Sequence, residues 1–190
     1  MRAALLTAAA LAGVLGLAAP PVVAAPFVDA ASGLKVDPPQ PFVVAPAKSQ
    51  TYDVAVVVNS LTGAPPLGAG DNYLCQIGYQ GLPGNADLDQ EEINLQVEQP
   101  DWLDHAAAAM SRSFDVTGKA TFVLDGATGI ELVGKPKDST HASGVFVSMV
   151  DTPKGRTTVN CATRPEEIDG AVNQFRLIRA SVTLPGTTSN

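Results

Sequence analysis

The chain has 190 residues and a formal charge of −7 at pH 7, with 45% hydrophobic and 16% charged residues. This length suffices for one domain with a hydrophobic core, and the apolar content is too high for a chain that is disordered throughout. A pI of about 4.6 leaves no basic surface to neutralise phosphates. The composition therefore excludes nucleic-acid binding as an expected function.

Residues 1–24 have the organisation of a secretory signal peptide. Arg2 supplies the positive start, residues 3–19 form an apolar run, and Pro20-Pro21 ends it. Small residues at the end of this segment favour cleavage after Ala24. Cleavage leaves 11 basic and 19 acidic residues, a charge of −8, and no later apolar run long enough to span a bilayer. We therefore expect a periplasmic or secreted protein with no membrane span.

Both cysteines, Cys75 and Cys161, follow the signal peptide. In an oxidising compartment an even cysteine count predicts disulfide bonding, and two cysteines allow one intramolecular pairing. Such a bond closes a long loop, for which the chain-entropy model gives a stabilisation of about 4–5 kcal/mol. Two buried free thiols are the alternative, and neither cysteine has the neighbouring ligand of a zinc site.

The first part of the mature chain predicts strands separated by loops. Residues 25–50 are rich in Pro and Ala, which indicates an extended lead-in with residues 42–44 as a candidate edge strand. Residues 52–59 are apolar and β-branched, which is typical of a strand. After a Gly- and Pro-rich loop at 61–70, residues 73–79 alternate and predict a second strand.

Two helices are expected next. Residues 89–98 carry a strand-like alternation but also an acidic start that is typical of a helix N-terminus, and we assign them as a helix. Residues 101–111 contain four consecutive alanines, the residue with the highest helix propensity. The apolar stripe of this second helix comprises Leu103, Ala106 and Met110.

The chain then predicts four strand-like runs, at 114–117, 120–124, 129–134 and 144–150. A hairpin loop at 125–129 joins the second and third runs. A second hairpin turn at 151–155 has the Asp, Pro and Gly that such turns require. Its return strand, residues 156–163, carries Cys161.

One long helix and a short strand are expected at the C-terminal end. Thr163 to Glu166 fits a capping box, with Pro165 in the first helical turn. The apolar residues then recur at helical spacing, which predicts a buried stripe formed by Ile168, Val172, Phe175 and Ile178. A strand-like stretch at 180–184 precedes a polar tail at 186–190.

This order of elements predicts a single α+β domain over residues 51–185, with a mainly antiparallel sheet and helices packed on its faces. The C-terminal half resembles the PsbP-like family in the layout of strand 144–150, turn 151–155, the return strand to Ala162 and the helix from Pro165. The resemblance implies an α/β/α sandwich. Members of that family act mainly as binding or assembly factors, which the resemblance implies for this chain.

Residues that could carry chemistry are sparse. His105 follows Asp101 by four residues on the second helix, a spacing that suits a metal or a base with its orienting acid, or an ordinary surface contact. His141 lies in a polar stretch that also contains serines. Trp102, the single tryptophan, is either an anchor for a partner or a core residue. These three residues are the candidate binding residues.

Metal and cofactor motifs are absent from the sequence. The stretch from Asn85 to Glu91 is similar to the start of a calcium loop, but Gln90 and Gln96 occupy the positions where an EF-hand needs Gly and Glu. The sequence has no nucleophile elbow, zinc-binding helix motif or P-loop. We therefore expect no metal, no cofactor and no catalytic residue.

The leading functional hypothesis is an exported binding or assembly-type protein without intrinsic catalysis. Its expected partner is a protein or a small ligand of the cell envelope. The alternative is a small secreted hydrolase whose site is assembled from residues far apart in the sequence, because such sites leave no local motif. A cleft that combines His105 or His141 with a carboxylate and a hydroxyl would favour the hydrolase.

Overall fold

The computed structural model describes residues 25–138 and 143–187, so the predicted signal peptide and His141 lie outside the described residues. Seven antiparallel strands form the main sheet, in the order β3-β4-β5-β9-β8-β7-β6. Their bounds are β3 (Phe42–Ala47), β4 (Val54–Ser60), β5 (Cys75–Gly81), β6 (Phe114–Leu124), β7 (Ala127–Pro136), β8 (Gly144–Thr152) and β9 (Gly155–Thr163). A small second sheet has the order β1-β2-β10, with β1 (Phe27–Val28), β2 (Lys35–Val36) and β10 (Val182–Thr183).

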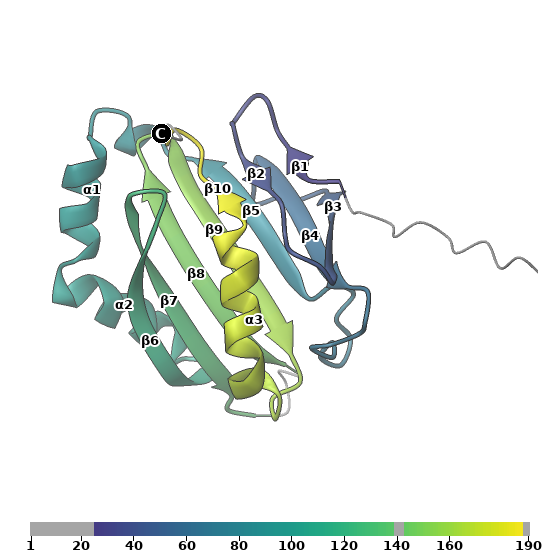
Figure 1. The fold of residues 1–190 in the computed structure, drawn as a ribbon. Coiled ribbons are helices and arrows are strands. Elements are labelled where there is room, and N and C mark those ends of the chain that lie inside the picture. Colours follow the sequence, from purple (N-terminus) through teal and green to yellow (C-terminus); the bar gives the residue numbers. More distant parts are fainter. Residues whose placement is uncertain (1–24, 139–142, 188–190) are drawn as a thin grey trace, which may run out of the picture.

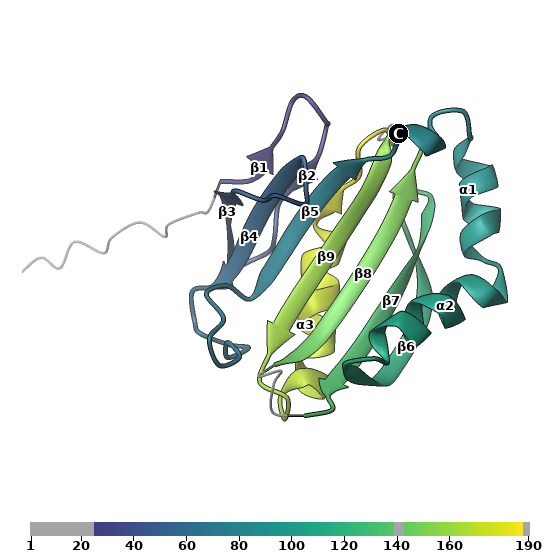
Figure 2. The same cartoon turned by 180° about the vertical axis from the view of Figure 1, so that it is seen from behind.

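In the described part of the chain, three α-helices lie on the two faces of the main sheet, and a short 3-10 helix (Pro83–Asn85) precedes them. Helix α3 (Ile168–Ala180) covers β7, β8 and β9 on one face (Figure 1). Helices α1 (Gln90–Val97) and α2 (Pro100–Met110) lie over β6, β7 and β8 on the other face (Figure 2). The predicted α+β class with helices on both faces is confirmed. On the second face no described helix lies over β4, β5 and β9.

The main core lies between α3 and the sheet. Three residues of the predicted stripe, Ile168, Phe175 and Ile178, are fully buried there. Val172 is only partly buried, and Ala171 takes its place with 2% exposure. The buried residues thus follow a spacing of three and four residues, which keeps them on one side of the helix.

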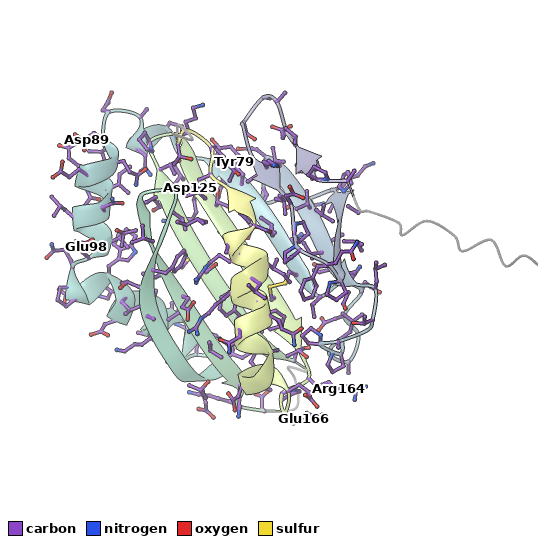
Figure 3. The ribbon with its side chains drawn as sticks, in the orientation of Figure 1. Tyr79, Asp89, Glu98, Asp125, Arg164 and Glu166 are labelled. Carbon is purple, nitrogen blue, oxygen red and sulfur yellow. A yellow bond between two sulfur atoms is a disulfide. The ribbon has the colours of Figure 1, made fainter. Side chains whose placement is uncertain are left out.

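The predicted disulfide is present between Cys75 of β5 and Cys161 of β9, and its sulfur atoms are yellow in Figure 3. The two strands are neighbours, and the two cysteines are directly opposite each other in the register. Both are buried in the main core, at 0% and 2% exposure. The bond therefore locks the pairing of β5, which comes early in the chain, with β9, which comes late.

The acidic helix start expected near residue 89 is also confirmed. The Asp89 carboxylate accepts a hydrogen bond from the backbone N–H of Glu92 at 2.9 Å, and the Glu92 carboxylate accepts one from the N–H of Asp89 at 2.9 Å. This reciprocal arrangement is a capping box. It gives Asp89 and Glu92 a structural role at the start of α1.

The capping box predicted at Thr163 to Glu166 is wrong. Thr163 is the last residue of β9, and its hydroxyl donates a hydrogen bond to the backbone oxygen of Pro66 at 2.6 Å. Arg164 and Glu166 lie in the turn that follows (Figure 3), and α3 begins at Ile168 without a side-chain cap. This hydrogen bond therefore connects the end of β9 to the loop that contains Pro66.

Residues 25–50 contribute more to the fold than an extended lead-in would. The candidate edge strand at 42–44 is present as β3, but this segment also forms β1 and β2. Leu34 and Val36 are fully buried in the main core. Packing against the core therefore begins before residue 51.

The hairpin between β6 and β7 is tighter than predicted. The runs at 114–117 and 120–124 are one strand, with a register shift between Val116 and Gly118. Its turn has two residues, Asp125 and Gly126, with φ angles of 50° and 80°. Positive φ at both positions is the pattern of a type I′ turn, for which Asp-Gly is a preferred sequence.

Candidate binding groove

The structure brings two of the three candidate binding residues together. Trp102 and His105 of α2 line a hollow of about 290 Å³, which Asp151 of β8 and Arg156 of β9 line from the sheet side. Trp102 is 39% exposed, so it is neither a buried core residue nor a freely projecting anchor. The remaining lining of this hollow is apolar: Val97, Ala106, Ile130 and Met149.

The carboxylate in this hollow is engaged by an arginine. Arg156 donates from Nε and a terminal nitrogen to the two Asp151 oxygens, at 2.7 and 2.8 Å. The hydrogen bond to Asp151 raises the pKa of Arg156 although burial opposes it. None of the described lining residues carries a hydroxyl group. Among the described residues that line this hollow, His105 therefore has neither the free carboxylate nor the hydroxyl that the hydrolase alternative requires.

A larger hollow of about 420 Å³ lies on the second face of the sheet, between the C-terminal end of α2 and strands β5, β8 and β9. We call it the sheet-face groove. Its lining residues are Asp71, Tyr73, Leu74, Gln76, Ala109, Met110, Ser113, Phe114, Val145, Val147, Asn160, Cys161 and Ala162. Figure 2 shows that α1 and α2 leave part of this face, over β4, β5 and β9, without a helix.

Two primary amides form the polar floor of the sheet-face groove. Gln76 of β5 lies directly opposite Asn160 of β9 in the register. Successive side chains of a strand point to opposite faces, so these amides point away from α3 while the neighbouring cysteines point toward it. The disulfide thus fixes the two amides side by side on the uncovered face.

Tyr52 lies next to this polar floor, outside the groove lining, and holds the Asn160 amide in place. The side-chain amide of Asn160 donates a hydrogen bond to the Tyr52 hydroxyl oxygen at 3.1 Å. The Tyr52 ring lies directly over Gly78, because a Cβ atom there would come within 2.3 Å of ring carbons. The ring can therefore pack against the sheet only because residue 78 has no side chain. Within the described residues, the Gln76 amide and the Asn160 carbonyl oxygen have no hydrogen-bond partner.

The walls of the groove are mixed in character. Val145 and Val147 of β8 are half-buried apolar residues beside Asn160. Tyr73 on the rim is 37% exposed. Asp71 contributes the single carboxylate of the described lining, and one of its oxygens accepts a hydrogen bond from the Ser143 hydroxyl at 2.6 Å. The arrangement offers uncharged hydrogen-bonding groups beside apolar surface, which suits binding.

Sequence reasoning missed Tyr52, Gln76, Gly78 and Asn160. A usable signal was nevertheless present, because the predicted disulfide pairs two strands at Cys75 and Cys161. Antiparallel pairing then places the residue after the first cysteine opposite the residue before the second. No sequence pattern indicates the position of Tyr52, because its ring occupies the space that a side chain at position 78 would fill.

Among residues 25–138 and 143–187, no group of three or more His, Cys, Asp and Glu side chains is placed to hold a metal ion. No helix within these ranges is long and apolar enough to cross a membrane.

Comparison with known proteins identifies the fold. No family model matches the sequence, and no curated protein matches it. The solution structure of cyanobacterial PsbP from Synechocystis sp. PCC 6803 is similar, with a TM-score of 0.52 and 13% sequence identity. The similarity covers 90% of this chain and 99% of that one. The chain therefore has a PsbP-like fold, and the likeness extends well beyond the C-terminal half that suggested it.

Proposed function

We propose that this protein is an exported binding protein of the cell envelope that acts without catalysis, through the sheet-face groove. The observation that carries the proposal is the uncovered half of the sheet, where Gln76 and Asn160 present unpaired hydrogen-bonding atoms beside apolar walls. The predicted signal peptide and the disulfide support export to a periplasmic or secreted location.

The groove chemistry favours binding over catalysis. General acid–base chemistry at neutral pH most often uses a histidine or a carboxylate with a perturbed pKa. The described groove lining has no histidine, its cysteine is held in the disulfide, and Asp71 is its single carboxylate. The PsbP-like fold also favours this class, since the resemblance implies binding or assembly factors.

An activity screen tests the absence of catalysis. The pure mature protein is incubated with ester, peptide, phosphate and glycoside substrates, and we expect no turnover above the buffer blank. The control is His105→Ala, which changes an exposed side chain and leaves the groove intact. Turnover that persists through purification and disappears in His105→Ala or in His141→Ala would establish the hydrolase and overturn the proposal.

A further inference from the structure

We infer that the sheet-face groove binds an uncharged saccharide, an inference that rests on the proposed function of the groove as a binding site. The hydrogen-bonding groups at its floor are of the kind that sugar hydroxyls need. The Gln76 amide can donate and accept, and the Asn160 carbonyl oxygen can accept. The Tyr52 hydroxyl, outside the lining, accepts a bond from the Asn160 amide nitrogen and leaves the Asn160 carbonyl oxygen free for a ligand. Each sugar hydroxyl both donates and accepts, which matches this mixture.

The apolar part of the lining fits the carbon skeleton of a sugar ring. Tyr73 and Phe114 provide aromatic surface, and Val145 and Val147 form an aliphatic patch next to the amides. The C–H faces of a sugar ring are apolar while its hydroxyls project from its edge. A volume of about 420 Å³ is within the range of small-molecule sites, about 300–1,000 Å³.

The charged groups of the described groove lining favour an uncharged ligand. No lysine, arginine or histidine occurs in the described lining, so a phosphate or acidic sugar would lack a cationic partner. The net negative charge of the whole chain also repels an anionic ligand. A cationic ligand would find a single carboxylate in the described lining, Asp71, which also accepts a hydrogen bond from Ser143. An uncharged ligand has neither problem.

A saccharide also fits better than an extended peptide. Peptides that add to a sheet pair with the free backbone of an edge strand. The groove floor is built on β5, which is paired with β4 and β9 on its two sides. A ligand in the groove can therefore be bound only through side chains. The hydroxyls of a sugar project outward around its ring and can form such contacts. Glycoside hydrolysis ordinarily needs two carboxyl groups, and the described lining has one, so the saccharide is bound and not cleaved.

The test uses three neutral tetrasaccharides as probes: chitotetraose, maltotetraose and mannotetraose. Each is titrated at up to millimolar concentration into the mature protein, with calorimetry for affinity and NMR for the side-chain amide signals. We expect at least one probe to bind and to shift the amide signals of Gln76 and Asn160. Gln76→Met removes the amide at nearly constant size, and it should weaken that binding at least fivefold.

Gln80→Met is the matched control, since Gln80 lies on the same strand and face but outside the groove. It should leave affinity unchanged. Tyr73→Ala, a change at an exposed rim residue, should also weaken binding and serves if Gln76→Met does not fold. The inference is overturned if none of the probes binds, or if binding survives both groove changes. Capture of a peptide or protein at Tyr73 in cells would overturn the inference of a saccharide ligand. It would still support the groove as a binding site.

Discussion

Replacing Phe175 by alanine is expected to lower the free energy of unfolding by about 3–5 kcal/mol. Phe175 is fully buried in the middle of α3, and its ring packs against Phe146 of β8 with ring centroids 5.8 Å apart. Truncation removes the apolar contacts of a whole ring and leaves a cavity that the rigid sheet below cannot fill. A loss of this size is a large share of the stability of an ordinary domain.

Equilibrium unfolding in denaturant, with the disulfide intact, measures this loss. Leu177→Ala is the matched control, because Leu177 lies on the same helix but is 55% exposed. Its change should be within about 0.5 kcal/mol, as for other surface positions. A loss below about 1 kcal/mol for Phe175→Ala would show that α3 does not seal the core.

Glu131→Gln is expected to cost about 3 kcal/mol at pH 7. Glu131 of β7 is 4% exposed and accepts hydrogen bonds from Arg176 and Arg179 of α3. Arg179 also lies over the Phe122 ring, 3.6 Å from its centroid. The substitution leaves the largely buried Arg179 without its counter-charge. We expect the lower end of the range for broken buried pairs, because the Arg176 side chain is 45% exposed and stays hydrated.

The same ion pair makes stability depend on pH. Burial alone would raise the pKa of Glu131, but the hydrogen bonds from Arg176 and Arg179 outweigh it and hold the pKa below its ordinary value. A lowered carboxyl pKa stabilises the fold above the unfolded pKa, about 4.3, and this stabilisation is lost as the pH falls through the folded pKa. The difference between wild type and Glu131→Gln should therefore shrink in acid.

Unfolding curves for both proteins between neutral pH and the acid range check this expectation. Asp104→Asn is the control, because it removes a carboxylate from the exposed ion pair with Lys119, and such pairs add little to stability. A stability difference for Glu131→Gln that is constant with pH would rule out the ion pair as its source.

The elements that could be predicted from the sequence are those with strong local patterns. The apolar spacing from Ile168 to Ile178 identified α3 and most of its buried side. The acids before residue 93 identified the start of α1, where Asp89 and Glu92 cap the helix. The predicted signal peptide and the even cysteine count together predicted the disulfide, which is present. In each case the signal lies within a few residues or follows from the oxidising compartment that the sequence predicts.

The features that could not be predicted depend on residues distant in the sequence. Thr163 has a capping pattern, but its hydroxyl bonds to Pro66, almost a hundred residues earlier. Leu34 and Val36 lie in a Pro-rich segment whose burial depends on pairing with the chain's last strand. The groove has the same origin, because Asn160 and Tyr52 are brought together by strand order and by the space above Gly78.

Photo-crosslinking in the cell tests the central claim, that the uncovered sheet face is where this protein binds. A photoreactive phenylalanine analogue replaces Tyr73 on the groove rim or, as the control, Leu177 on the exposed side of α3. The account predicts an adduct in the cell envelope from position 73 and none from position 177. Absence of an adduct at position 73, or equal labelling at the two positions, would contradict it.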